Sequence, residues 1–71
     1  MSEIQSIIFN KQYWNYSSSR RWLNEHHHFH PIKAPHETKN FIRYRLVDPS
    51  IFRRFRTKRL DNGIELVIGF R

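Results

Sequence analysis

The chain has 71 residues and carries 13 Lys or Arg against 6 Asp or Glu, a formal charge of +7. A chain of this length forms one domain, residues 1–71, and buries only about 60% of the surface that its unfolded form exposes. An enzyme with a large substrate cavity is therefore not expected. The sequence has no cysteine, which excludes disulfides, thiolate catalysis and Cys-containing zinc sites.

The N-terminal segment predicts a strand. Residues Ile4 to Phe9 form a short run rich in β-branched side chains, with no helix-start signal before it. Glu3 stands where a secretory signal would carry a base, and no apolar run approaches the ~18 residues that a membrane span needs. We therefore expect a soluble, intracellular protein without a membrane partner.

A helix is expected at about Ser18 to His28. The preceding serines can accept hydrogen bonds from the free N–H groups of a first helical turn. Trp22, Leu23 and His26 would share the buried face of this helix, since residues three and four apart are neighbours on its surface.

The histidines at positions 26–28 and 30 raise a metal hypothesis. His26 and His30 are four residues apart and would share a helix face, and His36 could join from the following loop. Cationic imidazoles near a helix C-terminus are also favoured by the helix dipole, which explains the tract without a metal. We assign no metal and no cofactor, and a small nuclease using these histidines is kept only as an alternative.

The middle of the chain predicts a half-buried strand. Two prolines favour an extended or turning connection from His30 to Thr38. Residues 41–46 then alternate, with Ile42, Tyr44 and Leu46 on one face and Arg43 and Arg45 on the other. We expect the face that carries Arg43 and Arg45 to be exposed to solvent.

The remaining segment predicts a short helix and a hairpin. Asp48 followed by a proline is a typical helix start, so a helical turn over about Pro49 to Phe55 would bury Phe52 and Phe55. A hairpin over Arg56 to Arg71 would turn through Asp61, Asn62 and Gly63. In this three-residue loop Gly63 is left-handed and Leu60 lies opposite Ile64, so that Ile64, Leu66, Ile68 and Phe70 line one face.

These elements predict an α+β domain. We expect a small mixed or antiparallel sheet of three to four strands, one main helix packed on one of its faces, and a C-terminal β-hairpin. The exposed terminal hairpin makes edge-strand pairing in a homo-oligomer reasonable.

The positive charge is concentrated in the second half. Residues 43–71 hold eight basic and three acidic side chains. Arginine, which makes up most of the excess, binds phosphate through two parallel hydrogen bonds. Seven of these bases fall within seventeen residues whose only acid is Asp48, and they are Arg43, Arg45, Arg53, Arg54, Arg56, Lys58 and Arg59.

These bases predict a binding surface for nucleic-acid phosphate. Arg43 and Arg45 would lie beside the bases of the hairpin on one sheet surface, with Phe41 as the best exposed ring for stacking on an unpaired base. The same arginines could instead anchor an acidic protein partner, or form only a solvated face. The carboxylates form no pair suited to acid–base catalysis and the serines lie in no nucleophile elbow, so we expect no enzyme.

Six short blocks span nearly the whole chain. They are Ile4-Gln5-Ser6-Ile7-Ile8-Phe9, Trp22-Leu23-x-x-His26, Arg43-Tyr44-Arg45, Asp48-Pro49, Phe55-Arg56-Thr57-Lys58 and Gly63-Ile64-Glu65-Leu66-Val67-Ile68-Gly69. Their order resembles a family of short uncharacterised basic proteins found in large DNA viruses and tailed phages. The resemblance implies a viral setting, inside the host cell or in the virion, where such a domain accompanies DNA, lines a capsid or obstructs a host complex. It supplies no catalytic residue, and the histidines at 26–30 depart from the Lys and Gly expected in relatives.

Overall fold

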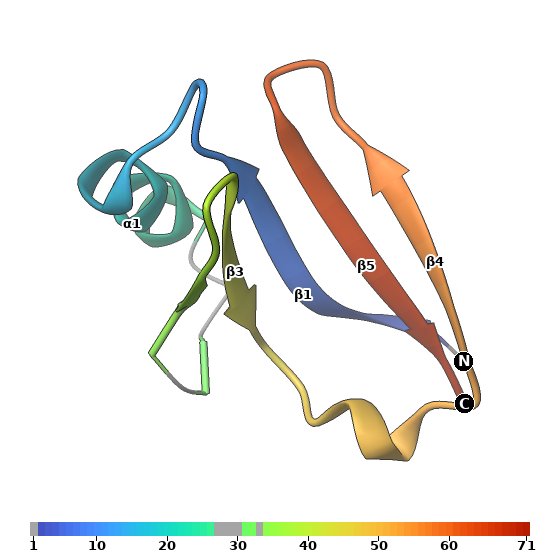
Figure 1. Ribbon diagram of the computed structural model, residues 1–71. Helices are drawn as coiled ribbons and strands as arrows, with labels where there is room; N and C mark the ends of the chain where they lie inside the picture. Colours follow the sequence, from blue (N-terminus) through green and yellow to red (C-terminus); the bar gives the residue numbers. More distant parts are fainter. Residues whose placement is uncertain (1, 27–30, 33) are drawn as a thin grey trace.

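The computed structural model describes residues 2–26, 31–32 and 34–71. Within these residues five strands form one antiparallel sheet in the order β2-β3-β1-β5-β4, and one α-helix packs against it (Figure 1). The elements in chain order are β1 (Ser2–Asn10), α1 (Tyr16–Glu25), β2 (His36–Glu37), β3 (Phe41–Arg45), the 3-10 helix η1 (Pro49–Ile51), β4 (Arg54–Arg59) and β5 (Ile64–Phe70).

The central strand β1 changes phase at a β-bulge. Ile4 pairs with Ile68 of β5, but the next paired residue is Ser6, opposite Val67, so Gln5 is the extra residue. The Gln5 side chain is fully buried and donates from Nε2 to the carbonyl oxygen of Val47 at 2.9 Å. Because of this extra residue, side chains on opposite sides of Gln5 that are an odd number of positions apart, such as Ile4 and Ile7, lie on the same face of the sheet.

Helix α1 begins earlier than the serine run indicates. Asn15 is the N-cap, and its side chain accepts a hydrogen bond from the backbone N–H of Ser18 at 2.8 Å. The Ser18 hydroxyl accepts in turn from the Asn15 backbone N–H, which completes a capping box. The helix ends at Glu25, and the ring of His26 stacks on Trp22 with 3.8 Å between centroids.

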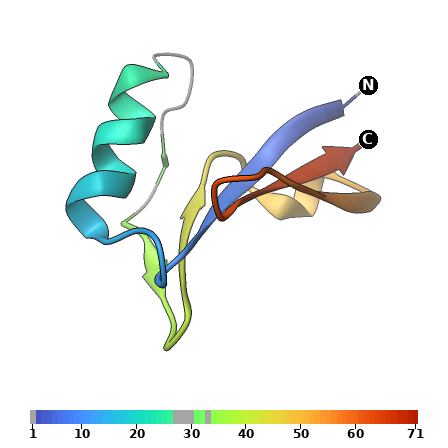
Figure 2. The ribbon, with the colours of Figure 1, turned by 90° about the horizontal axis from the view of Figure 1, so that it is seen from above.

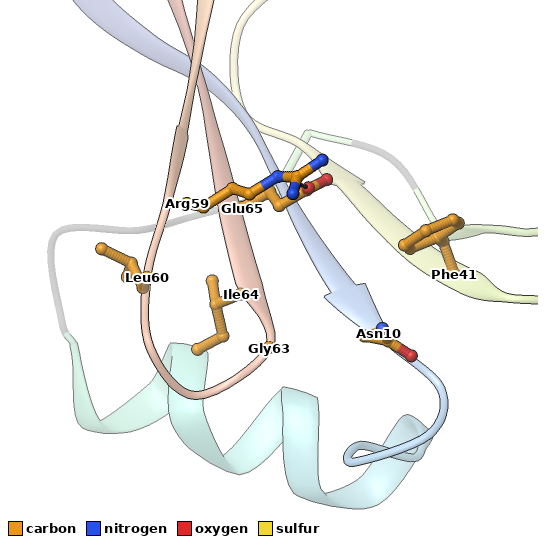
Figure 3. A pocket seen from close by; sticks show the side chains of 7 residues that line it. All are labelled: Asn10, Phe41, Arg59, Leu60, Gly63, Ile64 and Glu65. Atoms are coloured by element: carbon orange, nitrogen blue, oxygen red, sulfur yellow. Dashed lines mark ion pairs between the residues drawn. The ribbon is translucent and has the colours of Figure 1, made fainter.

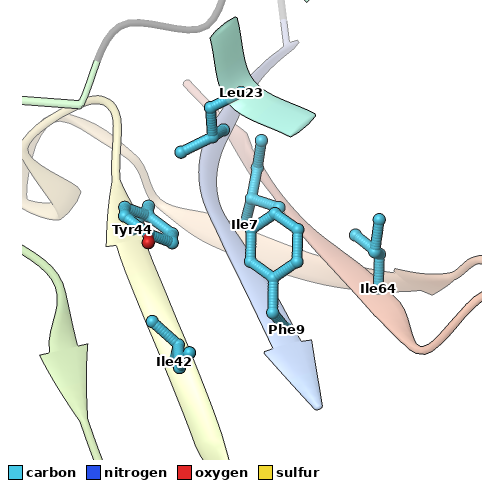
Figure 4. Packing of buried hydrophobic residues seen from close by; sticks show 6 residues of the cluster. All are labelled: Ile7, Phe9, Leu23, Ile42, Tyr44 and Ile64. Atoms are coloured by element: carbon cyan, nitrogen blue, oxygen red, sulfur yellow. The ribbon is translucent and has the colours of Figure 1, made fainter. Parts of the chain in front are cut away.

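The hydrophobic core lies between α1 and one end of the sheet. Aromatic rings cross edge to face there, with Phe9 5.5 Å from Tyr44 and 5.1 Å from Trp14 between centroids. Figure 2 shows α1 standing over the end of the sheet that carries β3, while β4 and β5 extend away from it. The buried cluster drawn in Figure 4 consists of Ile7, Phe9, Leu23, Ile42, Tyr44 and Ile64.

The connection from β3 to β4 passes the ends of β1 and β5 and is anchored by an aromatic ring. Phe52, which follows η1, is buried, and a Cβ added to Gly69 of β5 would lie under 3.0 Å from its ring. The absence of a side chain at Gly69 therefore makes room for Phe52. This contact holds η1 against the sheet face that α1 does not cover.

Several expectations are confirmed. The α+β class is correct, and the hairpin turns as predicted, with Gly63 at φ 79° and the Leu60 N–H bonded to the Ile64 carbonyl at 2.8 Å. The first strand, the alternation of β3 and the buried Phe52 are also found. The half-buried Leu46 follows β3 directly and packs on the core.

Other expectations are wrong in detail. The sheet has five strands rather than three to four, because the short β2 adds to β3 from a segment expected to be a connection. The helical turn after Asp48 ends at Ile51, and Phe55 is 46% exposed because it already belongs to the edge strand β4. Helix α1 stops before the predicted end at His28, and positions 27–30 lie outside the described residues.

Candidate functional site

The sheet has two faces of different character, which we call the helix face and the open face. The helix face carries the buried cluster and α1, whereas the open face is turned away from α1. Directly paired residues of antiparallel strands point to the same face. Phe41, Arg43 and Arg45 therefore lie on the open face, since they alternate with the buried Ile42 and Tyr44.

Strand β4 divides its basic residues between the two faces. Arg54, Arg56 and Lys58 pair with Phe70, Ile68 and Leu66 on the helix face. Arg59 pairs with Glu65 on the open face. All six residues of β4 are exposed, as is Arg53 just before it.

The expectation of one continuous basic sheet surface is wrong. Strand β3 is not a neighbour of the hairpin, because β1 and β5 separate it from β4. Arg43 and Arg59 lie in one cross-strand row on the open face, but three strand spacings, about 14 Å, separate their backbones. Five of the predicted bases thus fall into two groups. We call Arg54, Arg56 and Lys58 the edge strip, and Arg43 and Arg45 the β3 pair.

Acidic partners are unequally distributed over these groups. Glu65 forms an ion pair with Arg59, with 3.0 Å between Glu65 Oε1 and Arg59 Nε. The other ion pairs among the described residues are Lys11 with Glu37 and Arg71 with Glu3, at 3.5 and 2.7 Å. Within the described part of the chain, no acidic side chain pairs with the edge strip or the β3 pair. Their charge is therefore free to attract an anion.

Arg43 is held only loosely by the protein. Its Nη2 donates to Gln5 Oε1 at 3.3 Å, an oxygen that also accepts from the Ser6 hydroxyl at 2.9 Å. Its Nε is buried, with no hydrogen-bond partner among the described residues. A buried N–H without an acceptor is unusual, since most buried polar groups are paired. The guanidinium is thus short of acceptors.

Adjoining hollows lie on the open face around Phe41 and Arg43. One, of about 350 Å³, is lined by Ile8, His36, Thr38, Phe41, Arg43 and Glu65. A second, of about 230 Å³, shares His36 and Arg43 with it and adds Ala34, Pro35 and Arg45. A third, of about 240 Å³, shares Phe41 and Glu65 with the first and reaches the hairpin turn (Figure 3). The lining of the third is Asn10, Phe41, Arg59, Leu60, Gly63, Ile64 and Glu65.

Sequence reasoning missed three residues of this region. His36 reaches it from β2, Thr38 from the turn after β2, and Glu65 from β5. The alternation of β5 does place Glu65 on the face away from Ile64 and Leu66. No local signal could show that β1 lies between β5 and β3.

The metal hypothesis finds no support in the described residues. Among residues 2–26, 31–32 and 34–71, no three His, Cys, Asp or Glu side chains are grouped so that they could hold a metal ion. His26 is engaged with Trp22, whose carbonyl oxygen lies 2.8 Å from its Nδ1. His27, His28 and His30 lie outside the described residues. No described helix is long and apolar enough to cross a membrane.

Comparison with known proteins gives no relative: no family model, no curated protein and no solved structure matches the chain.

Proposed function

We propose that the protein is a non-enzymatic binding domain that holds nucleic-acid phosphate through its exposed cations. The observation that carries the proposal is the edge strip. Arg54, Arg56 and Lys58 point to one side of an edge strand, have no acidic partner among the described residues, and recur every second residue, about 7 Å apart. A regular row of unpaired cations suits a regular row of phosphates.

The arginine content strengthens the proposal. Two of the three cations in the edge strip are Arg, whose fork can hold a phosphate with two hydrogen bonds. The β3 pair adds two further arginines on the open face, so phosphates could be contacted on both faces of the sheet. The resemblance to proteins of large DNA viruses and tailed phages agrees with such a role, and the viral setting and the location in the host cell or virion stay predictions.

The test is fluorescence anisotropy with labelled DNA and RNA oligomers at several salt concentrations. If the protein makes about four phosphate contacts, raising the salt concentration from about 50 to 200 mM should weaken binding roughly 50- to 150-fold. The reason is that binding releases counterions from the nucleic acid, and this release is less favourable at higher salt. Absence of binding at the lowest salt concentration would refute the proposal.

Paired charge reversals separate the edge strip from overall charge. Arg54→Glu combined with Arg56→Glu should lower the affinity strongly and reduce the salt slope by about two. The matched control, Arg21→Glu combined with Lys39→Glu, makes the same change in net charge at exposed sites away from β4. If both double variants lose the same affinity, the edge strip has no special role.

An acidic protein partner is the second candidate, and the position of β4 favours it. Strand β4 is at the edge of the sheet, so its outer backbone groups are open to pairing with an added strand. Acidic side chains on that strand would then face the edge strip. Competition separates the two functions: polyglutamate should displace the labelled oligomer poorly if phosphate geometry matters, and readily if the strip recognises carboxylates.

A further inference from the structure

We propose that the hollows of the open face bind an unpaired nucleotide, so that the protein prefers single strands to duplexes. This inference rests on the proposed nucleic-acid function and adds a substrate class to it. The base would lie in the hollow of about 350 Å³, and its phosphate in the adjoining hollow of about 230 Å³.

The larger hollow has the chemistry of a base site. Ile8 of the central strand lines it together with Phe41, a ring on the same face that is 38% exposed. A flat base can stack on such a ring, and stacking is open to unpaired bases but closed to bases inside a duplex. The pairing of β1 with β3 sets both residues on the open face, away from the core.

The adjoining hollow has the chemistry of a phosphate site. Arg43 and Arg45 line it from β3, and His36 lines it from β2. Arg43 has a buried Nε without a partner among the described residues and only a long bond to Gln5. Because Nε is out of a ligand's reach, a phosphate in this hollow would accept from the Nη groups of Arg43, which have only the long bond to Gln5 among the described residues.

The two hollows are joined as a nucleotide requires. His36 and Arg43 line both, so base and phosphate sites share a wall. Together their volumes fall in the range of ordinary small-ligand sites, about 300–1,000 Å³. The combined space is therefore of a size that suits a single nucleotide.

Glu65 gives the base site a preference. Its carboxylate lines the hollow while its Oε1 lies 3.0 Å from Arg59 Nε. An ionised carboxylate only accepts hydrogen bonds, so it favours a base with an exocyclic amino group, such as cytosine, over thymine. We therefore expect oligo(dC) to bind more tightly than oligo(dT).

The experiment compares labelled oligo(dC), oligo(dT) and a duplex of equal length by anisotropy. The single strands should bind more tightly than the duplex. Phe41→Ala should lower single-strand affinity about 5- to 150-fold, the range that corresponds to loss of one stacked base. Duplex affinity should change less than about twofold, since backbone contacts remain.

Two variants serve as controls. Phe55→Ala removes another exposed ring, 46% accessible, from the edge strand and should leave single-strand affinity unchanged. Glu65→Gln should remove the preference for oligo(dC) over oligo(dT) with the fold intact by circular dichroism. Equal binding of single strands and duplex, or equal losses for the two phenylalanine variants, would overturn the inference and leave the proposed function standing.

A mononucleotide titration keeps the two proposals separable. In NMR, cytidine monophosphate should shift the amide signals of Thr38, Phe41 and Arg43, and inorganic phosphate should shift that of Arg43 but not those of Thr38 and Phe41. If cytidine monophosphate binds there while no oligomer binds anywhere, the proposed function fails and the site stands. If neither cytidine monophosphate nor any oligomer binds, both proposals are overturned.

Discussion

The hydroxyl of Tyr44 lies 2.7 Å from the hydroxyl of Ser19, and this contact joins the middle of β3 to the buried side of α1. The donor in this hydrogen bond can be assigned from the second hydrogen bond that the Ser19 hydroxyl makes. Ser19 Oγ donates its only hydrogen to the carbonyl oxygen of Tyr16 at 3.0 Å, so Tyr44 is the donor to Ser19. Two polar groups in the core are thereby satisfied.

Tyr44→Phe should destabilise the protein by about 1 kcal/mol, since the variant loses one buried hydrogen bond and keeps the ring in place. Urea unfolding followed by circular dichroism measures the change. Ser19→Ala leaves the Tyr44 hydroxyl without its acceptor and should cost more, about 1–3 kcal/mol. A smaller loss for Ser19→Ala than for Tyr44→Phe would contradict the assigned direction of donation.

The same tyrosine makes stability depend on alkaline pH. Burial raises the pKa of the Tyr44 phenol above its ordinary value of 10.0. In the unfolded chain the phenol ionises from about pH 10, while in the folded protein it stays neutral to higher pH. Its contribution to stability is therefore complete below about pH 10 and is lost as the pH rises through the folded pKa.

Comparison of urea midpoints at about pH 8 and pH 10.5 tests this effect. The unmodified protein should lose more stability over this interval than Tyr44→Phe, because the phenol is absent from the variant. All other titrating groups are common to both proteins and cancel in the difference. Equal losses would show that Tyr44 does not titrate differently in the folded and unfolded states.

Gly69→Ala should destabilise the protein by about 1–3 kcal/mol, the usual cost of forcing an extra methyl group into a packed site. The new Cβ would lie under 3.0 Å from the Phe52 ring, including Cγ, which the side chain cannot easily move away. Thermal unfolding of Gly69→Ala, Phe52→Leu and the double variant tests this clash. The two losses should not add in the double variant, since the smaller side chain relieves the clash.

Leu23→Ala should destabilise the protein by about 2–5 kcal/mol, because it opens a cavity between α1 and the sheet. Leu23 is the buried apolar residue of the helix, 3% exposed, and a domain of this size has only about 3–5 kcal/mol of net stability. We therefore expect a substantial unfolded fraction at 25 °C by circular dichroism. Leu66→Ala, at a half-buried position of β5, should cost clearly less.

Local patterns were enough to predict most elements of this fold. The alternation of residues 41–46 gives the faces of β3, and the residues Asp61 to Gly63 give the turn and register of the last hairpin. Both depend on neighbours in the chain. The same alternation placed Arg43 and Arg45 together on one face.

The strand order could not be predicted in the same way. Strand β1 pairs with both β3 and β5, and these contacts join residues that are 31 to 68 positions apart in the chain. Without this order one could not know that β1 and β5 separate the edge strip from the β3 pair. Helix α1 was expected to start at the serines, but Asn15 is the N-cap; Asn and Ser cap about equally well, so local preference could not choose between them.

The bulge at Gln5 has a consequence for changes in chain length. Ile4 and Ser6 already lie opposite consecutive residues of β5, so deleting Gln5 would leave Ile4 two residues from Ile7 and on the same face, with Ser2 to Ile4 still paired as before. The deletion would instead remove the backbone carbonyl that accepts from the N–H groups of Leu46 and Val47 at 2.8 and 3.2 Å. The extra residue therefore ties the segment that leaves β3 to the central strand, and a chain that lost it would keep its faces but release that segment.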